Sequence, residues 1–154
     1  MEDKVDASFL SEIVGVYHAK GTIFGELSYI IGKVALGRSC SLCDISHSGL
    51  SEKPQFEKIR KSLGVSFTTV HLDERSDDLA KFSSGKTPCV AGKLKETGRW
   101  IVLLKDEELE SCKKDVGTFE SKLKSAIIRE RNNLGKSSSG TSTAVVLVPA
   151  ESRT

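Results

Sequence analysis

The sequence predicts an α/β fold, because β-prone runs take turns with segments in which apolar residues recur every three or four positions. Three observations support this prediction. Residues 65–72 mix β-branched and aromatic residues with polar ones in near-alternation, residues 23–36 have helical spacing, and residues 89–104 hold two β-prone runs around a polar turn.

Composition and charge limit the classes of protein to consider. The chain has 154 residues, of which 38% are hydrophobic and 29% are charged, which is enough for one ordinary core. Lys and Arg number 23 against 21 Asp and Glu, and no basic stripe indicates nucleic acid as a partner. An acidic start, and Glu26 and Lys33 within the longest apolar stretch, argue against a secretion signal or a membrane span. We therefore expect a soluble, cytoplasmic protein.

Two elements are predicted before the cysteine-rich part of the chain. Residues 13–17 form a nearly continuous apolar run, which is typical of a strand in the middle of a sheet. Residues 23–36 follow with the spacing of an amphipathic helix, with Thr22 as its N-cap and Gly37 as its end.

The middle of the chain predicts a helix, a strand and a hairpin. Pro54 can open a helix that ends at Gly64, and the strand over residues 65–72 comes next. After a polar segment with one short helix, Thr87-Pro88 leads into the hairpin formed by residues 89–104.

Residues 119–127 carry apolar side chains at helical spacing and predict a last amphipathic helix. Beyond it the sequence becomes rich in Ser and Gly, and a segment of this composition buries too little apolar surface to become ordered. We therefore expect a single domain over residues 1–134 and a disordered Ser/Gly-rich tail over residues 135–154.

Residues 40–47 (Cys-Ser-Leu-Cys-Asp-Ile-Ser-His) form the motif with the most chemistry in the chain. If a helix begins near Cys40, then Cys40, Cys43 and His47 lie along one helical face. Thiols at this spacing serve reversible disulfide formation or metal binding, and a pair of buried, unreactive cysteines is the third alternative. At a helix N-terminus, Cys40 is the expected nucleophile.

The predicted order of strand, Cys-x-x-Cys, helix, strand, helix, Thr-Pro, strand, strand and helix resembles the thioredoxin-like fold, a three-layer sandwich. In that family the Cys-x-x-Cys motif begins the first helix, and a cis-proline before the third strand packs against it. The resemblance implies that Cys40 and Cys43 are the motif and that the bond before Pro88 is cis. The predicted helix over residues 23–36 is then an insertion before the motif.

Two strings also resemble a family of uncharacterised small microbial proteins with the motifs GELxYxxGK and CxLCDIxH. They are residues 25–33 (Gly-Glu-Leu-Ser-Tyr-Ile-Ile-Gly-Lys) and residues 40–47. This likeness implies an intracellular single-domain protein and no particular activity.

In a thioredoxin-like fold the segment around Pro88 faces the thiol motif, so Cys89 would lie within reach of Cys40 and Cys43. These three cysteines and His47 form a ligand set suited to tetrahedral Zn²⁺ or an Fe-S centre. The alternative for Cys89 is a strand residue packed into the core.

Three other residues have expected positions. His18 and His71 end two predicted parallel strands, which places them at the carboxyl edge of the sheet, where open α/β sheets have their sites. Cys112 lies in a charged segment and is expected to be exposed.

The sequence therefore supports a thiol-disulfide redox protein in which Cys40 attacks a disulfide and Cys43 resolves the mixed disulfide without a cofactor. The expected partners are protein or small-molecule thiols and disulfides, and neither nucleic acid nor a membrane. The alternative is a metal-binding module, with Zn or Fe-S, or a non-enzymatic interaction module that uses the same site. The oligomeric state does not follow from the sequence.

Overall fold

The computed structural model describes residues 4–18, 41–48 and 51–152. Within these residues, the main sheet is four-stranded and mixed, with the order β4-β1-β5-β6. Its strands are β1 (Leu10–Val16), β4 (Ser66–Val70), β5 (Cys89–Leu94) and β6 (Trp100–Leu104). β1 pairs in parallel with β4, whereas β5 is antiparallel to both of its neighbours, β1 and β6. The apolar run predicted to be a central strand is indeed β1, which has a partner on each side.

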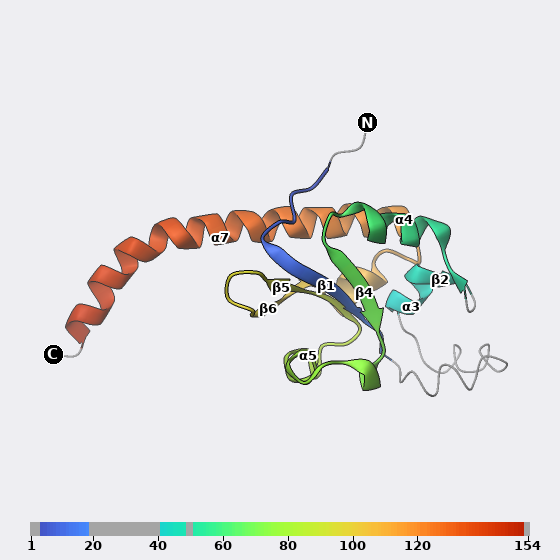
Figure 1. The fold of residues 1–154 in the computed structure, drawn as a ribbon, viewed down its shortest axis with the longest axis horizontal. Helices are drawn as coiled ribbons and strands as arrows, with labels where there is room; N and C mark the ends of the chain where they lie inside the picture. The colour runs from blue at the N-terminus through green and yellow to red at the C-terminus, as the bar shows by residue number, and fades with distance from the viewer. Residues whose placement is uncertain (1–3, 19–40, 49–50, 153–154) are drawn as a thin grey trace.

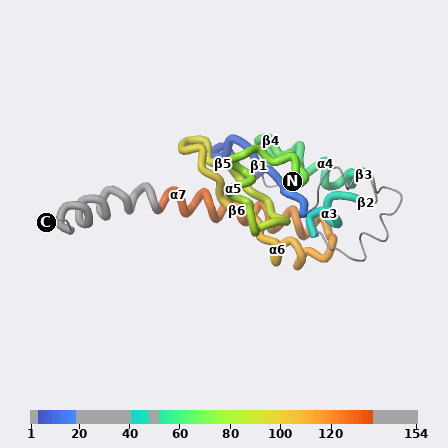
Figure 2. Tube along the Cα trace, turned by 90° about the horizontal axis from the view of Figure 1, so that it is seen from below, coloured from blue at the N-terminus to red at the C-terminus, as the bar shows by residue number. Residues whose placement is uncertain are grey.

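Helices cover both faces of this sheet (Figure 1). One face carries α3 (Ser41–Ser46), α4 (Pro54–Ser62), α6 (Asp106–Glu110) and α7 (Val116–Ser152). The other face carries α5 (Asp77–Ser83), which follows the short 3-10 helix η2 (Leu72–Glu74). In the view turned by 90°, α7 passes along β6 (Figure 2). The described residues therefore form an α/β structure with helices on both sides of a sheet.

Each face of the sheet buries its own apolar cluster, because successive strand side chains point to opposite faces. In β1, Ile13 points into the cluster under α3, α4 and α7, whereas Val14 points into the cluster under α5. We call these the α3-side cluster and the α5-side cluster. The helical residues of the α3-side cluster are Leu42, Ile45, Phe56, Ile59, Leu109, Val116, Phe119, Leu123, Ala126 and Ile127, and Cys112 joins them from the turn after α6. The α5-side cluster consists of Val14, Val16, Leu79, Cys89, Ala91 and Trp100.

The predictions for the middle of the chain are confirmed. Pro54 opens α4, and Gly64 just after it has a φ of 75°, a conformation that glycine adopts without strain. β5 and β6 form the expected hairpin in the same sheet as β4. The peptide bond between Thr87 and Pro88 is cis, as the resemblance to the thioredoxin-like fold implied. The predicted helix over residues 23–36 lies outside the described residues.

The expectation that His47 continues the helical face of the thiol motif is wrong. α3 ends at Ser46, and His47 begins the short strand β2 (His47–Ser48), which pairs with β3 (Ser51–Glu52). His47 is paired across this two-stranded ladder with Glu52. Two-residue strands have no periodic pattern, so the sequence held no signal for this turn of the chain away from the helix.

The last helix is longer than the apolar pattern alone predicts, because α7 extends to Ser152. Among the side chains that the structure describes, Leu134 is the last one of α7 that packs against the α3-side cluster. The division into a domain over residues 1–134 and a disordered tail over 135–154 stays a prediction. None of the helices in the described ranges combines the length and apolar character needed to cross a bilayer.

Gly15 of β1 lies under α3 and gives a first test of this packing. A Cβ atom added there would stand 3.0 Å from Cδ2 of Leu42 and 3.3 Å from Cγ2 of Thr69. Since Leu42 is fully buried and has little room to move, we expect Gly15→Ala to lower the free energy of unfolding by about 1–3 kcal/mol. Chemical denaturation monitored by circular dichroism measures this change.

The matched control is Gly135→Ala in α7, where an added Cβ meets nothing within 4 Å. Alanine is the better helix former, so this variant should gain up to about 1 kcal/mol. A Gly15→Ala protein as stable as the wild type would show that α3 does not press on β1 at this point.

Candidate functional site

The thiol motif is held at the carboxyl end of β1 by the packing of α3. Leu42 and Ile45 are fully buried in the α3-side cluster, and Ser46 at the end of the helix is buried as well. Cys43 lies between them in the first turn of α3 and packs against the same cluster with part of its surface exposed. The described part of the motif therefore lies at the start of a helix, as the sequence predicted.

The cysteines differ in their bonding. Cys43 is bonded in a disulfide. Cys89 and Cys112 are free thiols, and both are buried. Cys40, the other cysteine of the chain, lies outside the described residues.

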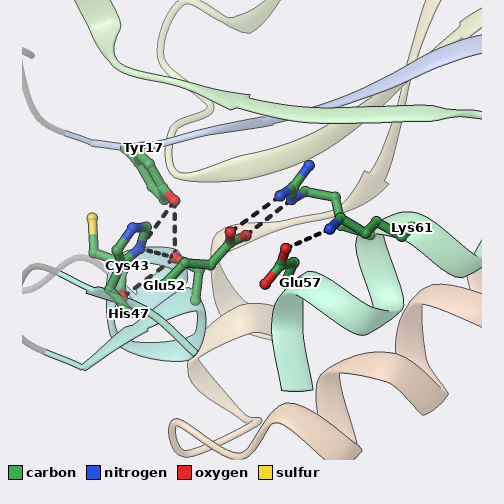
Figure 3. A network of polar contacts seen from close by, with 8 residues as sticks. Tyr17, Cys43, His47, Glu52, Glu57 and Lys61 are labelled. Carbon is green, nitrogen blue, oxygen red and sulfur yellow. Dashed lines mark hydrogen bonds and ion pairs between the residues drawn. The ribbon is translucent and has the colours of Figure 1, made fainter. Parts of the chain in front are cut away.

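A compact polar cluster adjoins Cys43 (Figure 3). The hydroxyl of Tyr17 lies 2.9 Å from Ser46 Oγ and 3.3 Å from His47 Nδ1, and Ser46 Oγ lies 2.8 Å from the same His47 nitrogen. Ser46 Oγ also lies 3.5 Å from the carbonyl oxygen of Cys43. These contacts connect the residue after β1 to the backbone of the thiol motif.

The β2-β3 ladder supports the cluster from the side of α4. Glu52, opposite His47 in the ladder, accepts two hydrogen bonds from Arg60 of α4, at 2.9 Å from Nε and 3.1 Å from Nη2. A guanidinium that binds a carboxylate through two parallel bonds fixes the orientation of both groups. Glu52 is thereby held in place beside the imidazole.

Burial changes the acidity of the two ring residues in this cluster. Desolvation lowers the pKa of His47, assisted by the nearby His71, while the carboxylate of Glu52 acts in the opposite direction. The imidazole is therefore neutral at pH 7, with one nitrogen as a donor and the other as an acceptor. Desolvation raises the pKa of Tyr17, so its hydroxyl keeps its proton and can donate it to a neighbour.

Both histidines expected at the carboxyl edge of the sheet lie there. His18 comes just after β1, and its Nδ1 lies 2.8 Å from the hydroxyl of Thr87, next to the cis bond. His71 comes directly after β4, where its Nδ1 lies 2.8 Å from Glu74 Oε1 and its ring stands 5.1 Å from the ring of Tyr17. The thiol motif, the polar cluster and the Thr87-Pro88 turn all belong to this end of the sheet.

Cys89 is not part of this group. It is the first residue of β5, fully buried in the α5-side cluster, whereas Cys43 packs against the α3-side cluster. The alternative in which Cys89 is a packed core residue is therefore confirmed. Burial raises the pKa of its thiol to about 11.

The described residues do not assemble the expected metal ligands. The set predicted from the sequence was Cys40, Cys43, His47 and Cys89, and the sheet separates Cys89 from Cys43. Among the residues that the structure describes, no group of three or more His, Cys, Asp or Glu side chains could hold a metal ion.

The expectation that Cys112 is exposed is wrong. It follows α6 and is 2% exposed, packed in the α3-side cluster with its Sγ 3.4 Å from the carbonyl oxygen of Glu108. Its charged neighbours in the sequence point outward, so local composition did not predict its burial.

Comparisons with known proteins add nothing to this geometry. No family model, curated protein or solved structure matches the chain. What can be said of its function therefore rests on the site itself.

We did not expect from the sequence that Tyr17, Ser46, Glu52 and Arg60 would be site residues. A signal was available for Tyr17, because a tyrosine at the end of an apolar strand has a hydroxyl that needs a hydrogen-bond partner when it is buried. The pair Glu52 and Arg60 has no such signal, since a separation of eight residues along the chain corresponds to no regular neighbour contact.

The burial of Cys89 predicts low reactivity. At pH 8 a thiol with a pKa of about 11 has far less thiolate than a free cysteine. Because the thiolate is the reactive form, alkylation of Cys89 by iodoacetamide should be slower by about a hundredfold or more. Mass spectrometry of the peptide that contains Cys89 measures its labelling in the native protein and in denaturant. Equal labelling rates in the two conditions would contradict its position in the α5-side cluster.

Proposed function

We propose that this chain is a thiol-disulfide redox protein of the thioredoxin-like type, with Cys40 and Cys43 as its active pair. The observation that carries the proposal is the disulfide at Cys43, in the first turn of α3. Cys40, three positions before Cys43 in the sequence, is the residue that we propose as the other member of the pair. A bond between cysteines three positions apart is the oxidised form that such an active pair requires.

The architecture supports the same proposal. A parallel pair β1-β4, an antiparallel hairpin β5-β6 beside β1, and helices on both faces are the features expected of a thioredoxin-like sandwich. The cis bond before Pro88 comes directly before β5, the strand that pairs with β1. We propose on these grounds that the domain is thioredoxin-like, with an insertion between β1 and the thiol motif.

The reaction that we propose takes place in two steps. In the reduced protein, the Cys40 thiolate attacks one sulfur of a disulfide substrate, and the substrate's other sulfur leaves as a thiolate that takes a proton from water. Cys43 then gives its proton to solvent and attacks the Cys40 sulfur, which releases the rest of the substrate as a second thiol. The substrate disulfide is reduced to two thiols, and the protein dithiol is oxidised to a disulfide.

The proposed partners are protein or small-molecule disulfides, with a cellular thiol as the reductant that restores the dithiol form. We propose the cytoplasm as the compartment, where thiol pools keep such a pair reducible. No cofactor takes part in either step.

Single replacements of the two cysteines test the proposal. Reduced protein is mixed with glutathione disulfide, and mass spectrometry follows the products with time. The wild type should pass to the intramolecular disulfide, and Cys43→Ser should stop at a mixed disulfide with glutathione on Cys40, because the resolving thiol is missing. Cys40→Ser should react with glutathione disulfide about tenfold more slowly than the wild type, or slower still, because the activated thiol is lost.

Cys112→Ala is the control, because this free thiol lies outside the active pair. It should react at the wild-type rate. A Cys43→Ser protein that accumulates no mixed disulfide would defeat the proposal, as would a wild type that stays reduced in glutathione disulfide.

A further inference from the structure

The position of α3, the helix that carries Cys43, depends on its contacts with the rest of the structure. α3 has six residues, and a helix of that length is marginal in water without support from the surrounding structure. Leu42 and Ile45 provide apolar support by their burial, but both precede the end of the helix. The last residue, Ser46, is buried and polar, and its orientation depends on hydrogen bonds.

Those hydrogen bonds lead to Tyr17. The Tyr17 hydroxyl, Ser46 Oγ and His47 Nδ1 form a closed triangle with sides of 2.9, 2.8 and 3.3 Å (Figure 3). Ser46 Oγ reaches on to the carbonyl oxygen of Cys43 at 3.5 Å. One phenol hydroxyl thus connects to the end of the helix and, through it, to the thiol residue.

Tyr17 is itself fixed to the sheet. Its backbone N–H donates to the carbonyl oxygen of Val70 at 2.9 Å, which continues the β1-β4 pairing by one residue. Tyr17 is 3% exposed, and its ring lies against the ring of His71. The hydroxyl is therefore a rigid point at the carboxyl edge of the sheet.

An ion pair supports His47 from the side of α4. The Glu52-Arg60 pair holds β3 against α4, and β3 pairs with β2, where His47 begins. The end of α3 is thereby held between the sheet and α4, and Tyr17 supplies the contact to the sheet.

We propose that Tyr17 is a positioning residue for the thiol-disulfide step, because its hydroxyl, acting through Ser46, holds Cys43 where it can attack the mixed disulfide on Cys40. This inference rests on the proposed function. In the step concerned, the Cys43 proton passes to solvent, a bond forms between the two cysteine sulfurs, and the substrate sulfur leaves as a thiolate. Attack within one chain depends steeply on the placement of the reacting atoms, and a misplacement of about 1 Å can cost up to a hundredfold in rate.

The two steps of the proposed reaction can be measured separately, and loss of the Tyr17 hydroxyl should slow only the second. Tyr17→Phe keeps the buried ring and removes the hydroxyl. Ser46→Ala removes the hydroxyl that connects Tyr17 to the backbone of Cys43. Each should slow the conversion of the glutathione mixed disulfide to the intramolecular disulfide by about tenfold. The first step, attack on glutathione disulfide, should stay within about twofold of the wild type, because it uses Cys40.

The double variant Tyr17→Phe/Ser46→Ala should resolve the mixed disulfide no more slowly than either single variant, since both act through one connection. The control is Ser83→Ala on α5, which removes the other fully buried serine hydroxyl found among the described residues. It should leave both steps unchanged. Thermal unfolding of each variant shows whether the fold is retained.

Three results would overturn the inference. They are wild-type resolution in a folded Tyr17→Phe protein, equal slowing of both steps, and slowing by Ser83→Ala as large as that by Ser46→Ala. A wild type that exchanges no disulfide would instead defeat the proposed function together with this inference, so the two failures are distinguishable.

Discussion

The contact of Leu42 with Gly15 is the constraint on which the candidate site depends. A helix as short as α3 gains its stability from burial, and Leu42 and Ile45 are both fully buried. Because Gly15 has no side chain, Leu42 can approach the β1 backbone closely. Cys43 and Ser46 follow Leu42 within one turn, so this close approach also sets the position of the thiol and of the polar cluster beside it.

The sheet divides the chemistry of the chain into two separate environments. On one face, Cys43 is partly buried, and the buried hydroxyl of Ser46 links it by hydrogen bonds to its polar neighbours. On the other, Cys89 is surrounded by apolar side chains such as Leu79 and Ala91, and its thiol is held in the protonated form by desolvation. Two cysteines at the same end of the sheet can therefore behave differently because strand side chains alternate.

Much of the fold could be predicted from the sequence, because alternation, helical spacing and turn residues are local physical properties. The hairpin, β4 and the helix between Pro54 and Gly64 follow from them. The polar cluster could not be predicted in this way, since the contact between Tyr17 and Ser46 joins residues far apart in the chain. Helical spacing also placed His47 on a face that ends one residue before it. Local charge likewise hid the burial of Cys112.

The central place of β1 has a consequence for the order in which the structure forms. β1 precedes the other strands of the sheet, yet its partners come much later, since Val16 pairs with Val70 and with Cys89. Non-local pairings form late because the intervening chain must first lose its freedom. During synthesis the thiol motif therefore leaves the ribosome before the sheet that shelters it can close, and meets the thiols and oxidants of its surroundings as an open chain.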